Sequence, residues 1–87
     1  MKRIPIGNGL FVLVDKEDYE ICARHRWHFH GGSAGRSIKR FGKYTVETMG
    51  RFLLGVNDDK LVRFANGNRL DCSRNNLVIT NNRWGAI

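Results

Sequence analysis

The sequence contains little of what marks several large classes of protein. It has two cysteines, Cys22 and Cys72, far apart and without a CxxC or CxxH neighbour. This is neither a disulfide framework nor a zinc-finger signature, and it favours reduced, packed thiols. After Met1 the N-terminal stretch has no apolar run longer than five residues. We therefore expect no signal segment, no transmembrane helix, no membrane partner and a cytoplasmic location.

Acidic residues are scarce, and the middle of the chain has none. Fifteen Lys and Arg against eight Asp and Glu give a net charge of +7 in 87 residues. Between Ile21 and Val46 there is no acid, while aromatic residues and glycines are interleaved with six Arg and Lys. Such a balance favours a polyanionic partner: nucleic acid first, then an acidic protein surface, then an anionic membrane. The alternative is that the charge only keeps the protein soluble.

The first half of the chain predicts two hairpins around one helix. With 41% hydrophobic and 10% aromatic residues, the chain can build one small core. Strands over 4–6 and 10–14 flank the turn Gly7-Asn8-Gly9. Asp15 predicts the N-cap of a helix from 16 to about 25 that buries Tyr19, Cys22 and Ala23. Strands over 27–30 and 36–40 and a turn over 41–43 complete this half.

The second half predicts a helix, a hairpin and a last helical turn. A helix over 46–54 ends at Gly55 and buries Val46, Met49, Phe52 and Leu53. Strands over 60–64 and 77–79 enclose the turn Asn66-Gly67 and a polar loop. Thr80 predicts the cap of a helical turn over 81–84. The fold class is thus α+β in a small single domain.

Residues 49–84 resemble the HNH endonucleases of phages and of intron-encoded homing elements. That family reads, loosely, L-H-R-L-I-x-G, then V-D-H-I-N-G-N-x-L-D-N-R-x-x-N-L-R, then T-x-x-x-N. Here the corresponding stretches are MGRFLLG at 49–55, VRFANGNRLDCSRNNL at 62–77 and TNNRW at 80–84. The preceding VDKEDY at 14–19, followed by Trp27, is similar to the AP2-like DNA-binding segments that accompany such modules.

The resemblance implies a two-part organisation within one compact domain. An AP2-like, β-rich segment over 1–44, made of a β-hairpin, a helix and a second β-hairpin, packs on an HNH-like ββα module over 45–87. Four positions of that module nevertheless carry the wrong chemistry. The metal-binding Asp and the general-base His correspond to Arg63 and Phe64, the last metal ligand to Trp84, and the His of the H-R dipeptide to Gly50.

These replacements exclude the family's reaction at that site. Arginine stays protonated and opposes a divalent cation, and phenylalanine accepts no proton. We therefore expect a degenerate nuclease that is not an enzyme, with no catalytic residue, no metal and no cofactor. What the resemblance keeps is the loop scaffold, in which Asn66 and Gly67 make the turn, Asp71 bonds the loop backbone and Asn76 pins the loop between the strands.

The histidines at 25, 28 and 30 raise a separate question of metal binding. On a strand, His28 and His30 share a face, with Trp27 and Phe29 on the other. No Cys, Asp or Glu lies close in sequence to complete a zinc site. The alternative is that Trp27 and Phe29 are core while the histidines lie at the surface near a phosphate-binding face.

Our leading hypothesis is a non-catalytic DNA-binding protein of phage or mobile-element origin, built on the degenerate HNH-like scaffold. Arg and Lys would contact phosphates, the middle hairpin would read any bases, and Trp84 would either stack on a base or cap the core. The expected nucleic-acid-binding residues are Arg36, Lys39, Arg40, Lys43, Arg51, Arg63, Arg69, Arg74, Arg83 and Trp84.

Two rival hypotheses stay open. One is an inhibitor that binds a host protein such as a defence nuclease or a polymerase, because Arg, Phe and Trp are common at interface hot spots. The other is residual nuclease activity through a relocated site that uses His28 or His30. The sequence does not distinguish DNA from RNA or determine the oligomeric state.

Overall fold

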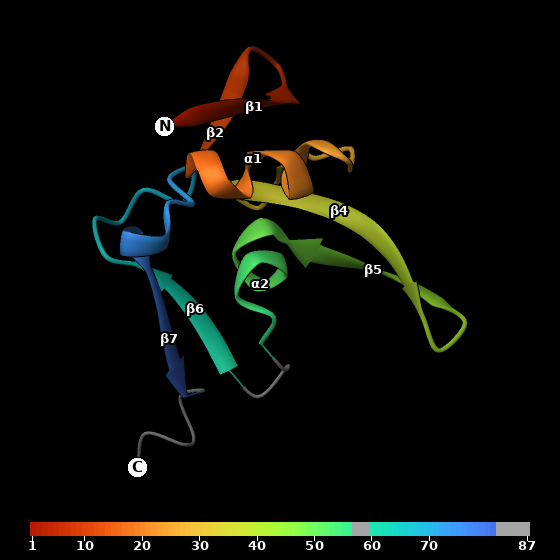
Figure 1. Cartoon of the computed structure of the whole chain (residues 1–87). Helices are drawn as coiled ribbons and strands as arrows, with labels where there is room; N and C mark the ends of the chain where they lie inside the picture. The colour runs from red at the N-terminus through yellow and green to blue at the C-terminus, as the bar shows by residue number, and fades with distance from the viewer. Residues whose placement is uncertain (57–59, 82–87) are drawn as a thin grey trace.

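The structure is a computed structural model that describes residues 1–56 and 60–81. Over these residues it is a single domain of the expected mixed α+β class, with two helices and short antiparallel strands (Figure 1). The elements in chain order are β1 Lys2–Gly7, β2 Leu10–Val14, α1 Lys16–Ala23, β3 His28–His30, β4 Ser33–Arg40, β5 Lys43–Thr48, α2 Met49–Leu54, β6 Lys60–Phe64, the 3-10 turn η1 Arg74–Asn76, and β7 Leu77–Asn81.

The strands form three small sheets rather than one. Strand β1 pairs with β2, β4 lies between β3 and β5, and β6 pairs with β7, all antiparallel. In Figure 1 the β1–β2 hairpin lies on one side of α1 and the β6–β7 hairpin lies toward the other end of the molecule. Helix α2 lies between the β6–β7 hairpin and β5, and the distal part of the β4–β5 hairpin extends away from the body.

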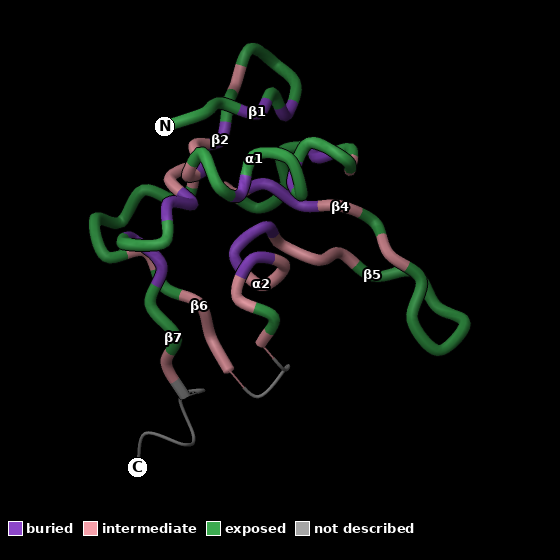
Figure 2. Tube along the Cα trace, in the orientation of Figure 1, coloured by how far each residue is buried: buried purple, intermediate pink, exposed green. Residues whose placement is uncertain are grey.

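One hydrophobic core joins the three sheets. Ile4 and Val12 enter it from the first sheet, Ala34 from the second and Leu77 from the third. Figure 2 shows the buried segments gathered along the middle of the molecule, with the hairpin ends exposed. The backbone of Leu13 also connects β2 to the loop before η1. Its N–H donates to the Leu70 carbonyl (2.8 Å) and its carbonyl accepts from the Cys72 N–H (2.7 Å).

Helix α1 differs from its predicted form in both length and buried face. It ends at Ala23 instead of continuing to residue 25, and it buries Asp18 and Cys22. Tyr19 and Ala23, predicted to be buried, are exposed. The prediction was wrong because it took only apolar residues to be buried, whereas Asp18 is buried against an arginine from the second half of the chain. Phe29 was also predicted as core and is exposed, so only Trp27 is buried on that side.

The strand β5 was missed by the sequence analysis. A helix was predicted over 46–54, but residues 43–48 pair with β4 and only Met49–Leu54 is helical. The β-branched Thr45, Val46 and Thr48 suit a strand, and the two-residue turn at 41–42 sets their register. The predicted boundary between residues 44 and 45 therefore falls inside a continuous β-hairpin.

The remaining elements follow their predictions more closely. Gly55 ends α2 with a φ of 62°, as a left-handed C-cap does, and β6 covers the predicted 60–64. Thr80, predicted as a helix cap, belongs to β7 instead. The helical turn predicted over 81–84 meets β7 at Asn81, and its other residues lie outside the described part of the chain. Neither described helix is long and apolar enough to cross a membrane.

Candidate nucleic-acid interface

The β4–β5 hairpin is the most prominent exposed feature of the structure. Its strands pair from Gly35 with Thr48 out to Arg40 with Lys43, where the two-residue turn Phe41-Gly42 connects them. Both turn residues have positive φ, 53° at Phe41 and 77° at Gly42. Positive φ at both central positions defines the type I′ turn, which matches the twist of a two-stranded ribbon.

One face of this hairpin is basic and partly concave. Arg40 and Lys43 contribute to a hollow of about 410 Å³ between the hairpin and the end of α2. Arg51 and Glu47 also line this hollow. Glu47 is paired with Arg36 at 2.7 Å, so its negative charge is neutralised locally. The hollow therefore gathers three cationic side chains, of which Arg51 also donates from Nη2 to the Lys60 carbonyl at 2.6 Å.

The other face of the hairpin combines charge with an aromatic ring. Lys39 and Tyr44 lie opposite each other in the register, and the Lys39 Nζ lies 5.7 Å from the centre of the Tyr44 ring. Tyr44 is 77% exposed and Phe41, at the turn, is 96% exposed. The end of the hairpin thus presents basic and aromatic side chains on both faces. This combination suits contacts to nucleic-acid phosphates and bases.

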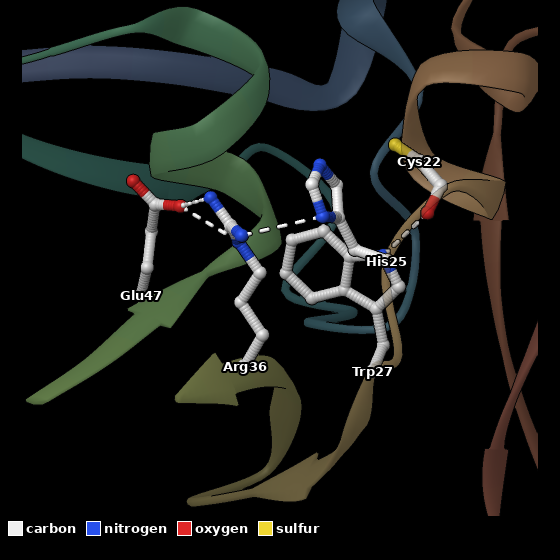
Figure 3. A network of polar contacts seen from close by, with 5 residues as sticks. All are labelled: Cys22, His25, Trp27, Arg36 and Glu47. Carbon is white, nitrogen blue, oxygen red and sulfur yellow. Dashed lines mark hydrogen bonds and ion pairs between the residues drawn. The ribbon is translucent and has the colours of Figure 1, made fainter. Parts of the chain in front are cut away.

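The base of the hairpin is anchored by Arg36, as Figure 3 shows. Its Nε and Nη2 both donate to Glu47 Oε1, at 3.0 and 2.7 Å, and its Nη1 donates to His25 Nδ1 at 3.3 Å. Because arginine only donates, His25 Nδ1 must be the unprotonated, accepting nitrogen. Arg36 was predicted to contact nucleic acid, but these bonds make it a residue that holds the hairpin to the body.

Aromatic rings enclose this anchor. The Arg36 guanidinium lies 5.8 Å from the centre of the Trp27 ring and 5.1 Å from that of Phe52. Trp27 in turn donates from Nε1 to the Cys22 carbonyl at 2.8 Å, close to the end of α1. The hairpin is therefore joined to the body by cation–π contacts, edge-on aromatic contacts and hydrogen bonds.

Arg74 is also committed to an internal contact. Its Nε and Nη2 form two parallel bonds with the Asp18 carboxylate, at 2.8 and 2.9 Å, while its backbone N–H donates to Asp15 Oδ2 at 2.9 Å. The hydrogen bond with Asp18 raises the pKa of Arg74 above its usual value. Asp15 is the N-cap of α1, as predicted, but its side chain makes no capping bond there and instead accepts the first N–H of η1.

A second basic hollow lies beside the end of β6. Arg63 and Arg69, with Phe64, Ser33 and Thr48, line a space of about 440 Å³. Arg69 Nη1 donates to the Gly31 carbonyl at 3.1 Å, which links this hollow to the turn between β3 and β4. These two arginines therefore share one surface, separate from the hairpin hollow.

Gly50 packs closely against the neighbouring strand. A Cβ atom at this position would lie 3.0 Å from Val62 Cγ1 and 3.7 Å from Leu77 Cδ2. A larger side chain, such as the histidine that the resemblance places there, has to displace Val62. The packing of α2 against β6 thus depends on the absence of a side chain at Gly50.

The loop between β6 and β7 is held by its own polar side chains. Asn76 accepts the Asn66 N–H at Oδ1 (2.9 Å) and donates from Nδ2 to the Asp71 carbonyl (2.8 Å). Asp71 accepts from the Ser73 N–H and hydroxyl at Oδ1 and from Asn66 Nδ2 at Oδ2. Burial acts to raise the pKa of Asp71, but these hydrogen bonds outweigh it and hold that pKa below 3.8. Gly67 completes the turn with a φ of 77°.

The histidines do not form a metal-binding cluster within residues 1–56 and 60–81. No three His, Cys, Asp or Glu side chains meet there in a group suited to a metal. His28 and His30 are exposed, with ring centres 6.4 Å apart, whereas His25 packs edge-on against Trp27 and Phe52. Arg83 and Trp84, both predicted to bind nucleic acid, lie outside the described residues.

The structure thus divides the predicted binding residues into groups. Lys39, Arg40, Lys43 and Arg51 gather around the hairpin, Arg63 and Arg69 share the second hollow, and Arg36 and Arg74 hold the fold. Sequence reasoning missed Phe41 and Tyr44 as site residues, although an aromatic-glycine pair between two basic strands was a usable signal.

A scan against protein-family models found no match to this chain, and searches of curated proteins and of solved structures found none either. The function has therefore to be inferred from the geometry of these residues themselves.

Proposed function

We propose that this protein is a non-catalytic nucleic-acid-binding protein, with DNA as its ligand and a degenerate HNH-like module as its scaffold. The observation that carries the proposal is the β4–β5 hairpin, which presents Lys39, Arg40 and Lys43 beside a hollow that Arg51 also lines. A basic ribbon with exposed aromatic rings can follow a nucleic-acid backbone and stack on its bases. Cationic side chains along its edges are then within reach of the flanking phosphates.

The second hollow supports a longer binding surface. Arg63 is exposed on β6, and Arg69 is positioned by the Gly31 carbonyl. Arginine binds phosphate with two parallel hydrogen bonds, so this pair provides a second phosphate contact. In this proposal the edge that holds a metal in HNH nucleases binds the nucleic-acid backbone instead.

Two observations favour binding without cleavage. Arg63 and Phe64 close β6 with a fixed positive charge and an apolar ring, where a metal ligand and a base are required. Gly50 is held against Val62 so closely that a histidine does not fit without a shift of that side chain. Intact plasmid after incubation with Mg²⁺, Mn²⁺ or Zn²⁺ is the expected result, and specific nicking would contradict it.

The binding proposal is tested by removing charge from the hairpin. The double variant Lys39→Ala/Lys43→Ala should weaken DNA binding by roughly tenfold or more near physiological salt, because two phosphate contacts are lost. Lys16→Ala/Arg24→Ala removes the same charge from the exposed surface of α1 and is the matched control. If the two variants bind DNA with equal affinity, binding depends only on net charge and the hairpin is not the binding site. If the wild type binds no DNA, the proposal is refuted.

A second candidate function is inhibition of a host protein such as a nuclease or polymerase. It is favoured by β7, where Val78 is 41% exposed on one face of the strand and Ile79 is 48% exposed on the other. Large exposed apolar residues at a strand are typical of a protein contact. A pull-down from nuclease-treated host lysate with the wild type and with Val78→Lys separates the candidates. A stoichiometric partner lost on this substitution supports inhibition, and the same recovery with both proteins opposes it.

A further inference from the structure

We propose that Phe41 is a stacking wedge, which inserts its ring against unpaired or unstacked bases at the end of the β4–β5 hairpin. This inference rests on the proposed function and makes it more specific. The preferred ligand is then single-stranded nucleic acid, or a duplex with a bulge or easily opened step, rather than regular duplex. Lys39, Arg40 and Lys43 hold the backbone while Phe41 contacts a base.

The first observation is that Phe41 is poorly suited to its place in the free protein. Its φ of 53° lies in the left-handed region, which a bulky side chain rarely adopts. Asparagine or glycine is the preferred first residue of a type I′ turn. The ring is 96% exposed, so burial in the described fold does not compensate for the backbone strain. Strained residues of this kind are concentrated at functional sites.

The second observation is the charge around the ring. Arg40 and Lys43 are paired directly before and after the turn, and Lys39 lies one step further back against Tyr44. A purely apolar pocket of a protein would accept the ring but would offer no anion to Lys39 or Lys43. Nucleic acid offers an aromatic face for the ring and a phosphate for each cation.

The third observation is the shape of the hairpin. Figure 1 shows its end lying away from the helices and from the other two sheets. The exposed turn therefore reaches a ligand before the body does. Arg36 anchors the base of the same hairpin through Glu47 and His25, so that the wedge is presented on a fixed support.

The wedge implies a preference among nucleic acids. Inserting a side chain between paired and stacked bases requires that the step be opened, which costs free energy. An unpaired base has already lost part of that stacking, and it gains a new partner in the ring. Affinity should therefore rank single strands and bulged duplexes above a regular duplex of the same length and charge.

The decisive variant is Phe41→Asn, which removes the ring and suits the turn. Asn-Gly is the favoured type I′ pair, so the melting temperature should stay the same or rise. Affinity for a single-stranded oligonucleotide should nevertheless fall about tenfold or more, and Phe41→Trp should restore it. Binding to heparin, which has charges but no bases, should be unchanged. The control is Phe11→Thr, which removes the same kind of ring from β2, where Phe11 is 46% exposed. This variant should bind the oligonucleotide as the wild type does.

A direct readout uses Phe41→Trp as a reporter. Its emission should be quenched on adding the single-stranded oligonucleotide but not on adding heparin. If Phe41→Asn keeps wild-type affinity while Lys39→Ala/Lys43→Ala loses it, the wedge is refuted and the proposed function stands. If the wild type binds no oligonucleotide of any form, both fail. Wild-type binding to phosphatidylserine vesicles, lost in Phe41→Asn, with no oligonucleotide bound, would assign the ring to a lipid surface and overturn both.

Discussion

At the scale of single residues, the two arginines that hold the fold show how position decides the role of a charge. Arg36 and Arg74 are each paired with a carboxylate from another element. Their partners lie 11 and 56 positions away in the sequence. Composition counts all of these charges alike, so it overstates the charge that remains for a ligand.

The pair of Asp18 and Arg74 makes an asymmetric prediction. The side chain of Asp18 is 8% exposed, whereas that of Arg74 is 46% exposed and can reach water when its partner is removed. Arg74→Met should therefore lower the free energy of unfolding by about 2 kcal/mol, because a buried carboxylate is left unpaired. Asp18→Asn should cost only about 1 kcal/mol. Chemical denaturation of both variants and of the double variant measures this, and equal losses would contradict the asymmetry.

The two thiols should be inert in the folded protein. Burial is the main cause that raises the pKa of Cys22 to about 11 and that of Cys72 to about 12. The reactive thiolate is therefore a minor species at neutral pH. Ellman's reagent should react slowly with the native protein and rapidly in guanidinium chloride. Rapid reaction of both thiols without denaturant would show that these residues are more accessible than their burial implies.

At the scale of elements, local sequence patterns correctly predicted the strands that clear turns bound. They failed where a long-range contact determines the secondary structure or the burial of a residue. The β1–β2 hairpin, β6 and the Gly55 cap follow from glycine placement and alternation. The strand β5 does not, because residues 46–54 also match a helical pattern and only pairing with β4 settles their form. Likewise, nothing near Asp18 in sequence shows that an arginine 56 residues later will bury it.

The centre of the second sheet should tolerate no side chain at Gly35. Its strand pairs on one side with β3 and on the other with β5, and an added Cβ would lie 2.8 Å from Val46 Cγ1. Valine is stiff, so the strands themselves must move. Gly35→Ala should lower stability by about 1–3 kcal/mol. Ser37→Ala, at an exposed position of the same strand, should change it by less than about 0.5 kcal/mol. Similar melting temperatures for these two variants would refute the close packing.

The loop between β6 and β7 should lose stability in acid through Asp71. Its pKa is lower in the folded protein than the ordinary 3.8, so its ionised form is stabilised by folding. That contribution is complete above the ordinary pKa and is lost as the pH falls through the lower, folded value. The stability difference between the wild type and Asp71→Asn should thus shrink between about pH 5 and pH 2. If the stability difference grows on acidification, the prediction is contradicted, because folding then raises the pKa of Asp71 instead of lowering it.

At the scale of the whole molecule, the sequence predicted the chemistry of the surface better than its arrangement. A basic, acid-free middle segment indicated a polyanion, and the structure brings four of the predicted cations around one hairpin and two into a second hollow. The roles of Arg36 and Arg74 in holding the fold depend on carboxylates distant in sequence. The exposed aromatic end depends on a turn conformation. Both are properties of the folded chain, so composition alone could not supply them.

The arrangement of charge sets the salt dependence of binding. If the hairpin group of Lys39, Arg40, Lys43 and Arg51 forms about four phosphate contacts, the logarithm of the binding constant should fall with that of salt concentration at a slope near −3 to −4. Lys43→Ala should reduce the magnitude of the slope by about 1, and Arg63→Ala by a similar amount only if the second hollow also contacts the backbone. Phe41→Asn should weaken binding to single strands without changing the slope, since stacking releases no counterions. Fluorescence anisotropy titrations from about 50 to 300 mM salt measure all three. If Lys43→Ala leaves the slope unchanged, Lys43 contacts no phosphate. The nucleic acid is then bound by other parts of the surface, which carries a net charge of +7.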